Sequence, residues 1–410
     1  MAHVGRCCLA STVADFIPVA KALRREFETT AAALDATGEY PTRNMERIVE
    51  TGLDAICFPR EWGGVASGNP HEDLEAAAEI FTELSAGESS TAQIFTVHRN
   101  LVLGLLSGTG VAEEWKRKIW REVRFEGAHF CSPASEPTKK RFSFRTSCTP
   151  VAGGVLINGK KYFATGCEGA RYGWLPVLLD GYPSVEEGGL YNVVVRLDAD
   201  GVTLNHDWDN MGQRATGSGS VTFSNVFVPD GLHWKPGAGS DFVSTANVNG
   251  PASQVVMSAI LLGMGLGALD AMSAYVRDRV RPSDPAWASQ AENPVIQHQV
   301  GRYSAMLAAA RAALREAARG IADFARNGGS RAEVSVKMMQ AKVSILEATL
   351  TIAGDVHRHC GGMSTSNAFR LDRFWRNARA LSTHDSQDIK LQQIGRYVLS
   401  GIEPPIDYVT

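Results

Sequence analysis

The sequence predicts a mixed fold in three parts: an N-terminal helical domain over residues 1–124, a central β-domain over residues 125–236 and a C-terminal helical bundle over residues 237–410. In the first part, apolar residues recur at helical spacing. In the second, β-prone runs alternate with glycine-containing turns. In the third, apolar positions repeat over stretches long enough for bundle helices. Helices, then a β-domain, then a bundle make a restricted architecture.

Two helices are expected in the N-terminal domain, over residues 72–84 and 91–106, because both segments carry apolar residues at helical spacing. Before them, Pro59–Gly64 brings a proline and two glycines into the helical pattern. Such a composition is typical of a loop. The first part is therefore predicted to consist of helices joined by loops.

The central domain contains three segments with strand character. Val151–Gly166 predicts a hairpin with its turn at Asn158–Gly159, because Asn-Gly favours tight turns. Leu190–Leu204 predicts two short strands around a turn at residues 198–201, and Ser220–Pro229 alternates like a strand. We expect a small barrel or sandwich.

The C-terminal part contains a long helix with apolar residues three and four positions apart: Val300, Tyr303, Leu307, Ala310, Leu314, Ala317, Ile321 and Phe324. A second helix is expected over Glu333–His359, stopped by Gly361–Gly362. A third is expected to begin near Asp385 and to end near Gly401. Long helices of this kind pack antiparallel into a bundle.

Composition excludes several classes of function. The 410 residues carry a net charge of −3, and no stretch is dense in Lys or Arg, which argues against nucleic-acid binding. No run of 18 apolar residues occurs, so a membrane span is not expected, and the N-terminus lacks the pattern of a signal peptide. The seven cysteines match no zinc spacing, so we expect no metal and a cytoplasmic protein with reduced thiols.

Several short motifs, in order along the chain, give the sequence a family resemblance. They are Phe58–Gly64, Ser135–Pro137, Gly159–Gly166, Met211–Arg214, Phe223–Pro229, Gly361–Gly362 and Arg373–Arg379. Each is weak alone, but their order and spacing resemble the acyl-CoA dehydrogenase superfamily over nearly the whole chain. The resemblance implies the acyl-CoA dehydrogenase fold, with an N-terminal helical domain, a central β-domain and a C-terminal four-helix bundle.

Within that superfamily, the sequence is most similar to the two-component flavin monooxygenases of the dibenzothiophene monooxygenase type. The similarity is carried by Phe369–Arg379, Thr383–Asp385, Asp207–Trp208, Gly212–Gly219 and Arg281–Pro282. It implies reduced FMN supplied by a separate NAD(P)H:flavin reductase, O2 as co-substrate, a C4a-hydroperoxyflavin, and oxygenation of a small molecule at sulfur, nitrogen or an aromatic carbon. It also implies a homotetramer.

The resemblance points to His384 as a catalytic residue. Acyl-CoA dehydrogenation requires a carboxylate base beside the flavin. The segment that matches the dehydrogenases' base is Thr383–Asp385, which has no glutamate, and none occurs from Ala259 to Pro282, where other branches keep it. An imidazole at position 384 could donate a proton to a flavin peroxide or act as a base toward substrate. The alternative is that His384 only caps a helix beginning at Asp385.

The resemblance also places His98 near the substrate pocket, although a histidine on a helix is often simply packed. The implied flavin contacts are the backbone of Ser132 and Ala134, then Phe163, Thr165, Trp208, Arg281 and Arg376. Trp208 could equally belong to the core. Arg281 resembles an arginine that reaches a flavin phosphate across a subunit boundary; an ordinary surface ion pair is the alternative.

FMN is the expected cofactor, and FAD stays possible because Gly361–Gly362 lies where FAD-using members pass the adenosine half. No Gly-x-Gly-x-x-Gly fingerprint follows a strand, which argues against a nicotinamide site. Phe95, Trp208 and Phe242–Val256 are expected to line the substrate pocket, with Gly237–Asn249 as a mobile lid. Two other functions stay open: an FAD-dependent acyl-CoA dehydrogenase with a displaced base, and a non-catalytic scaffold of the same fold.

Overall fold

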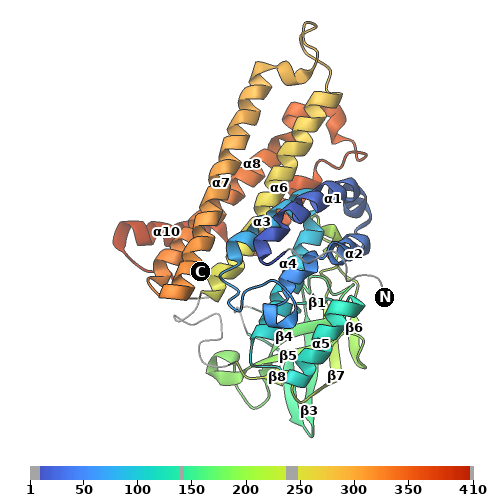
Figure 1. The fold of residues 1–410 in the computed structure, drawn as a ribbon, viewed down its shortest axis with the longest axis vertical. Coiled ribbons are helices and arrows are strands. Elements are labelled where there is room, and N and C mark those ends of the chain that lie inside the picture. The colour runs from blue at the N-terminus through green and yellow to red at the C-terminus, as the bar shows by residue number, and fades with distance from the viewer. Residues whose placement is uncertain (1–9, 139–142, 237–247, 407–410) are drawn as a thin grey trace.

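The structure is a computed structural model, and it describes residues 10–138, 143–236 and 248–406. Figure 1 shows the strands gathered at one end, with the long helices α6, α7 and α8 running away from them. Helices α1 (Ile17–Thr37), α2 (Thr42–Glu50), α3 (Leu74–Gly87) and α4 (Ser89–Ser107) lie around the junction of these two parts, and α5 (Glu113–Glu126) lies beside the strands. The predicted lid, Gly237–Asn249, lies largely outside the described residues. Of the predicted pocket segment Phe242–Val256, residues 248–256 are described and lead into helix α6 (Asn249–Arg279).

The N-terminal part is helical, as predicted. It consists of η1 (Val13–Phe16), α1 (Ile17–Thr37), α2 (Thr42–Glu50), η2 (Leu53–Cys57), η3 (Arg60–Trp62), α3 (Leu74–Gly87), α4 (Ser89–Ser107) and α5 (Glu113–Glu126). Helices α3 and α4 are the two expected from residues 72–84 and 91–106. The carboxylate of Glu88 caps α4, accepting from the N–H groups of Ser90 at 2.9 Å and Thr91 at 2.6 Å.

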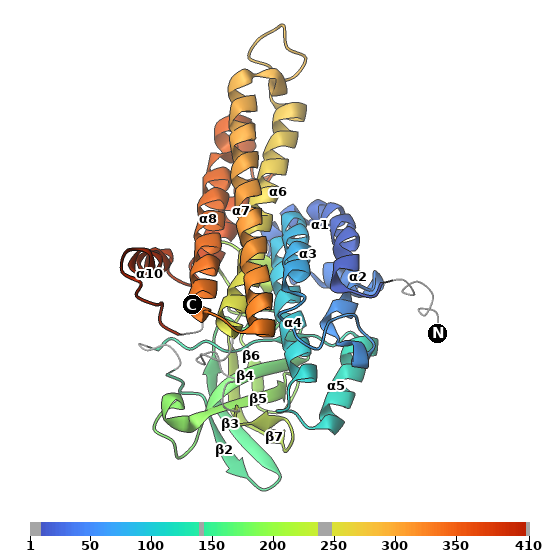
Figure 2. The ribbon, with the colours of Figure 1, turned by 60° about the vertical axis from the view of Figure 1, so that its left-hand side comes forward.

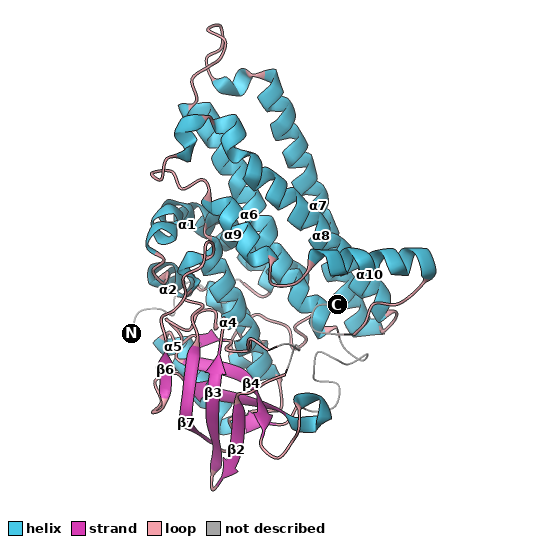
Figure 3. Ribbon diagram, turned by 180° about the vertical axis from the view of Figure 1, so that it is seen from behind, coloured by secondary structure: helices cyan, strands magenta, loops and turns pink. Residues whose placement is uncertain are grey.

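The central part is one eight-stranded sheet in the order β6-β7-β3-β2-β4-β5-β8, with β1 paired to β4. The strands are β1 (Phe130–Cys131), β2 (Ser147–Val151), β3 (Gly154–Lys161), β4 (Tyr172–Leu179), β5 (Leu190–Arg196), β6 (Val202–Leu204), β7 (Val221–Pro229) and β8 (His233–Trp234). A π-turn, η4 (Val185–Gly189), and a 3-10 turn, η5 (Arg214–Thr216), interrupt it. Figure 3 shows this sheet as a separate layer below the helices. The predicted strands around residues 198–201 and over 220–229 are β5, β6 and β7.

The predicted turn at Asn158–Gly159 is wrong. The chain turns at residues 152 and 153, between β2 and β3, and β3 continues through Asn158–Gly159. The register against β7 shifts between Ile157 and Gly159, which marks a bulge. Gly159 has φ +142°, and a Cβ there would lie 2.6 Å from the Cα of Thr146. Glycine is therefore required by a bulge and not by a hairpin turn, and the two have the same sequence signature.

The C-terminal part contains α6 (Asn249–Arg279), η6 (Gln290–Glu292), α7 (Pro294–Asn327), α8 (Arg331–Cys360), η7 (Gly362–Thr365), α9 (Arg373–Ser382) and α10 (Gln387–Ser400). Figure 2 shows α6, α7 and α8 side by side. The predicted seam of α7 is buried at Tyr303, Leu307, Ala310, Leu314, Ala317 and Ile321. Gly361 ends α8, its N–H bonded to the carbonyl of His357.

Helix α6 joins the N-terminal helices to the bundle. It is long and apolar enough to cross a membrane by length and composition, but most of its apolar stretch is buried inside the protein. Its backbone is contacted on two sides. Ser85 of α3 donates to the carbonyl of Ile260 at 2.7 Å, and Thr349 of α8 donates to that of Leu261 at 3.0 Å. Its apolar surface is thus explained by a protein core.

Candidate functional site

A buried polar network fixes the loop that precedes β7 against the helices. Gln213 donates from its backbone N–H to Asn377 Oδ1 of α9 at 2.7 Å and from Nε2 to Gln93 Oε1 of α4 at 2.6 Å. Ser89 Oγ donates to Gln213 Oε1 at 2.6 Å, and Asn377 Nδ2 donates to Ser89 Oγ at 3.1 Å. Every group in this network has a partner, so it gives the loop one position.

Beside this network, two of the predicted flavin contacts come together. Phe163 is 60% exposed, has φ +54°, and meets Trp208 edge to face at 6.1 Å. The indole Nε1–H of Trp208 donates to the carbonyl of Gln213 at 2.9 Å, which orients the ring. A large exposed aromatic side chain beside a fixed indole provides an apolar surface suited to a flat ring system.

Thr165 lies at the same edge and is nearly buried. Its Oγ1 accepts from Ser218 Oγ at 3.0 Å and from Gln93 Nε2 at 3.4 Å. Its N–H donates to the carbonyl of Phe163, as the N–H of Ala134 does to that of Ser132, both at 2.9 Å. The N–H groups of Thr165 and Ala134 are therefore already hydrogen-bonded within tight turns. A ligand could contact only the exposed atoms of these turns.

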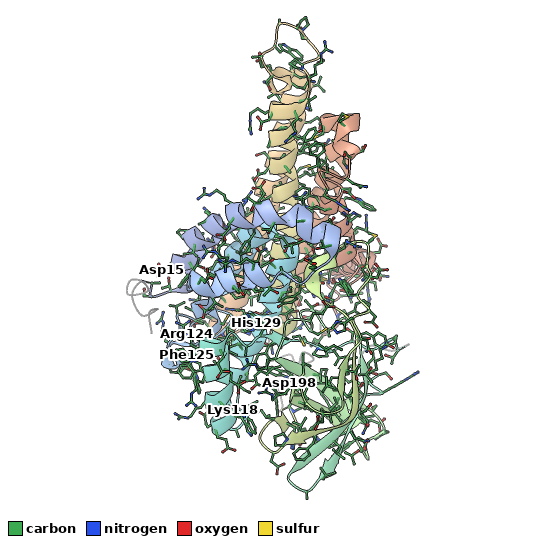
Figure 4. All side chains as sticks on the ribbon, turned by 90° about the vertical axis from the view of Figure 1, so that its right-hand side faces the viewer. Asp15, Lys118, Arg124, Phe125, His129 and Asp198 are labelled. Carbon is green, nitrogen blue, oxygen red and sulfur yellow. The ribbon has the colours of Figure 1, made fainter. Side chains whose placement is uncertain are left out.

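His98 is packed in the interior, with 3% of its surface exposed. Its Nδ1 accepts from the N–H of Phe130 at 3.1 Å, so the neutral ring carries its proton on Nε2. Its ring meets that of His129 edge to face at 5.0 Å. Burial, with a smaller effect of His129, lowers the pKa of His98 well below its usual value. Figure 4 shows His129 where the helices meet the sheet. A proton-transfer role for His98 stays a prediction.

His384 lies above a buried ion cluster that the sequence did not reveal. Its Nδ1 is 3.6 Å from Oδ1 of Asp385, whose side chain is 3% exposed. Asp385 forms ion pairs with Lys342 of α8 and, at 2.6 Å, with Lys390 of α10. The imidazole of His384 is more open, at 37%. The ion pairs of Asp385 thus hold the segment of residues 383–385 in place, and the imidazole of His384 stays accessible.

The helix that the sequence predicts to begin near Asp385 is α10. Helix α10 begins at Gln387, and its cap is Ser386, whose Oγ accepts from the N–H of Ile389. Neither His384 nor Asp385 caps it. Burial raises the pKa of the Asp385 carboxyl, but the opposing effects of His384, Lys342 and Lys390 outweigh it and hold the pKa well below its usual range. Asp385 is therefore a fixed negative charge and a poor proton acceptor.

The two arginines predicted to bind flavin lie in different environments. Arg376 of α9 pairs with Asp35 at 2.6 Å and Asp372 at 2.7 Å, and donates to the carbonyl of Met211 at 2.7 Å. It joins α1, α9 and the network loop. Arg281 is exposed just beyond the end of α6. Since α6 has 31 residues, Arg281 lies about 46 Å from the start of that helix, and Figure 1 shows α6 running away from the sheet.

No metal centre is found in the described part of the chain, where no three His, Cys, Asp or Glu side chains come together. The described cysteines, Cys57, Cys131, Cys148, Cys167 and Cys360, are free and buried. Burial raises the pKa of the Cys148 and Cys167 thiols to about 12. Such thiols are unreactive.

Two family models match the chain: "Acyl-CoA dehydrogenase, N-terminal domain" over residues 18–123 and "Acyl-CoA dehydrogenase, C-terminal domain" over residues 255–388. A dibenzothiophene monooxygenase from Mycolicibacterium goodii is 30% identical over 406 residues, covering 94% of each chain. A protein from Pseudomonas putida named probable FMNH2-dependent monooxygenase SfnC is 26% identical over 396 residues, covering 95% of each.

Solved structures agree in fold. FMN-bound TdsC from Paenibacillus sp. A11-2 superposes with a TM-score of 0.85 at 24% identity, covering 97% of this chain and all of that one. Methanesulfinate monooxygenase MsuC from Pseudomonas fluorescens gives a TM-score of 0.83 at 23% identity, covering 96% of this chain and 99% of that one. With the matched family models and the near full-length relatives, these similarities show that the chain belongs to the acyl-CoA dehydrogenase family, in the branch of the dibenzothiophene monooxygenases.

Proposed function

We propose that the protein is a flavin-dependent monooxygenase that uses reduced FMN and O2 to oxygenate a small organic molecule at sulfur, nitrogen or an aromatic carbon. The observation that carries this is the difference in burial and pairing between His384 and Asp385. The only carboxylate in the segment that matches the dehydrogenases' base is Asp385, and it is buried between Lys342 and Lys390. A dehydrogenase needs a carboxylate free to take a proton. Here the accessible group is the imidazole of His384.

The residues at the end of β3 fit a flavin. Phe163 and Trp208 would pack against the ring system, and Thr165, with the turns at Ser132 and Ala134, would meet its polar edge. When bound, reduced FMN supplies the electrons that activate O2. His384 would hold or deliver a proton at its Nε2, because its Nδ1 faces Asp385. His98 would act only as an Nε2–H donor.

Arg281 would bind the FMN phosphate from a second copy of the chain. It cannot do so within its own chain, because the length of α6 separates it from the sheet. Among the described residues it forms no ion pair that would occupy its guanidinium. This arrangement supports a homo-oligomer, and we propose the tetramer that the resemblance implies. Arg376, held by Asp35 and Asp372, would instead support the site from behind.

We further propose a source for the reduced FMN and a location for the protein. The chain shows no nicotinamide fingerprint, so reduced FMN would come from a separate NAD(P)H:flavin reductase, making a two-component system. The relative named as FMNH2-dependent supports this source. We propose a cytoplasmic location, in keeping with the buried free thiols of the described cysteines.

The test supplies photoreduced FMN, 18O2 and a sulfur heterocycle, dibenzothiophene, or an indole as probe, and follows product mass and hydrogen peroxide. We expect one 18O atom in the product. His384→Ala should lower the product yield at least about tenfold while hydrogen peroxide rises, because the proton donor is lost. His298→Ala, an exposed histidine of α7, is the matched control and should match the unaltered protein.

The competing function, an acyl-CoA dehydrogenase with a displaced base, makes the opposite prediction. Such a protein would purify yellow with tightly bound FAD, and the colour would bleach anaerobically on adding an acyl-CoA. Anaerobic bleaching by butyryl-CoA would therefore overturn the proposal. So would an unchanged ratio of product to hydrogen peroxide in His384→Ala.

A further inference from the structure

Arg99 of α4 is a buried charge without a counter-ion. Only 2% of its surface is exposed. Its Nη1 donates to Asn100 Oδ1 at 3.2 Å, whereas Nε and Nη2 have no hydrogen-bond partner. Among the ion pairs of the described residues, none involves Arg99. Burial lowers the pKa of Arg99, and the smaller effects of Cys57 and then Asp73 oppose this. A guanidinium stays ionised in proteins, so folding alone leaves this charge uncompensated.

The two free nitrogens are the pair that binds carboxylates elsewhere in this chain. Arg47 uses Nε and Nη2 to hold both oxygens of Glu26, at 2.6 and 3.1 Å. Arg319 holds Glu75 through the same atoms at 2.8 and 2.7 Å, and Arg196 holds Asp198 at 2.8 and 2.6 Å. Arg99 therefore presents a complete bidentate edge, with the geometry that two oxygens of one anion require.

A second unpartnered group lies near this edge. His71, in the segment before α3, has a buried Nδ1 without a hydrogen-bond partner. Burial lowers the pKa of His71, a hydrogen bond of its ring with the side chain of Asn249 opposes this, and the nearby charge of Arg99 lowers it further. His71 is thus close to Arg99, neutral and fixed through its bond to the first residue of α6. The Nδ1 of His71 is thus a second buried atom with unused hydrogen-bonding capacity near Arg99.

The same helix, α4, carries this region and one contact of the proposed flavin surface. Gln93, earlier on α4, contacts Thr165, and Arg99 follows six residues later, about 9 Å along the helix axis and on a different face. Phe95 lies one turn before Arg99 on the same face of α4 and packs edge to face against Phe81 at 6.1 Å. An organic acid held at Arg99 would lie along this face of α4, toward Phe95.

We propose that Arg99 binds the anionic group of an organic acid substrate, a carboxylate or sulfinate attached to an apolar or aromatic body. Calling the bound acid a substrate rests on the proposed function, whereas the anion site itself does not depend on it. The bound group would place two oxygens on Nε and Nη2 and neutralise the buried charge. The substrate class of this enzyme is then acidic, in contrast to a neutral heterocycle.

The test measures binding without flavin, so that its outcome is independent of oxygenation. Purified protein is titrated by calorimetry with benzoate and with benzamide, its neutral isostere. We expect benzoate to bind at least about tenfold more tightly, because charge-assisted bidentate bonds are the stronger ones. Arg99→Met should remove this preference, and Arg99→Lys should weaken it, since lysine keeps the charge but loses the fork. Arg121→Met, at an exposed arginine of α5, is the control.

Thermal unfolding adds a readout that a purely structural arginine would not give. Without ligand, Arg99→Met should melt at the same temperature as the unaltered protein or higher, because an uncompensated buried charge is removed. A marked fall would mean that Arg99 stabilises the fold, and would overturn the proposal. Equal binding of benzoate and benzamide would also overturn it. So would binding of inorganic sulfate as tight as that of benzoate, because the site would then be one for a free inorganic anion. Oxygenation of neutral probes alone would leave the proposed function standing and remove this inference.

Discussion

Replacing Asp385 with asparagine removes the negative charge from the cluster beneath His384. In the native protein this carboxylate pairs with Lys342 and Lys390, and the three side chains are only 3–4% exposed. Asparagine has nearly the same shape, so packing changes little, but the two lysines lose this counter-charge. We therefore expect Asp385→Asn to fold with a clearly lower free energy of unfolding.

The magnitude follows from the burial of the cluster. Removing one partner of a buried ion pair lowers the free energy of unfolding by about 3–5 kcal/mol. An unfolding entropy of about 2 cal/mol/K per residue amounts to roughly 0.9 kcal/mol/K for 410 residues. The melting temperature should then fall by roughly 3–6 °C. The same change in Asp323→Asn, whose pair with Arg326 is exposed, should lower the free energy of unfolding by less than about 1 kcal/mol.

The assay is equilibrium urea denaturation of the purified protein, with thermal melts as a second measurement. The pKa of Asp385 is lowered by folding, so its stabilisation is complete above about pH 5 and is lost as the pH falls through the folded-state pKa. The difference between the variant and the unaltered protein should therefore shrink in acid. Adding Lys390→Met to the variant should restore part of the stability. A loss under about 1 kcal/mol for Asp385→Asn, or no rescue, would refute the reasoning.

Two further predictions concern His129 and Gly212. Burial lowers the pKa of His129 to about 4 against the opposing hydrogen bond of its ring to the backbone of Gly169, so up to about 3 kcal/mol of stability, present above pH 6.5, should be lost as the pH falls from 6.5 to 4. Urea denaturation at several pH values should show a shallower decline for His129→Gln, and an equal decline would contradict the assignment. A Cβ on Gly212 would lie 2.1 Å from the carbonyl oxygen of Arg376, so Gly212→Ala should lower the free energy of unfolding by about 1–3 kcal/mol in the same assay. Gly301→Ala, on open helix surface, should be neutral or stabilising, and equal losses in both variants would show that the contact with α9 is not tight.

The helical parts and the family could be predicted from the sequence alone. The apolar seam of α7 could be recognised because residues three and four positions apart lie on the same face of a helix. The order of short motifs pointed to the acyl-CoA dehydrogenase family, and the family models agree. Where one local signal has two meanings, the sequence misled: Asn158–Gly159 is a bulge, because backbone geometry at a glycine depends on the strand that lies opposite.

The pairing of the buried charges could not be predicted from the sequence, because it depends on the folded arrangement of distant segments. Lys342 and Asp385 are 43 positions apart, and no local pattern shows that they share one buried cluster. The network of Gln213 with Gln93 and Asn377 likewise joins three separate elements. Arg99 reads in sequence as one more helical arginine, and its missing counter-ion is visible only in the folded chain. Periodicity is a local property that a sequence carries directly, whereas the partner of a buried charge is set by which distant segments the fold brings together.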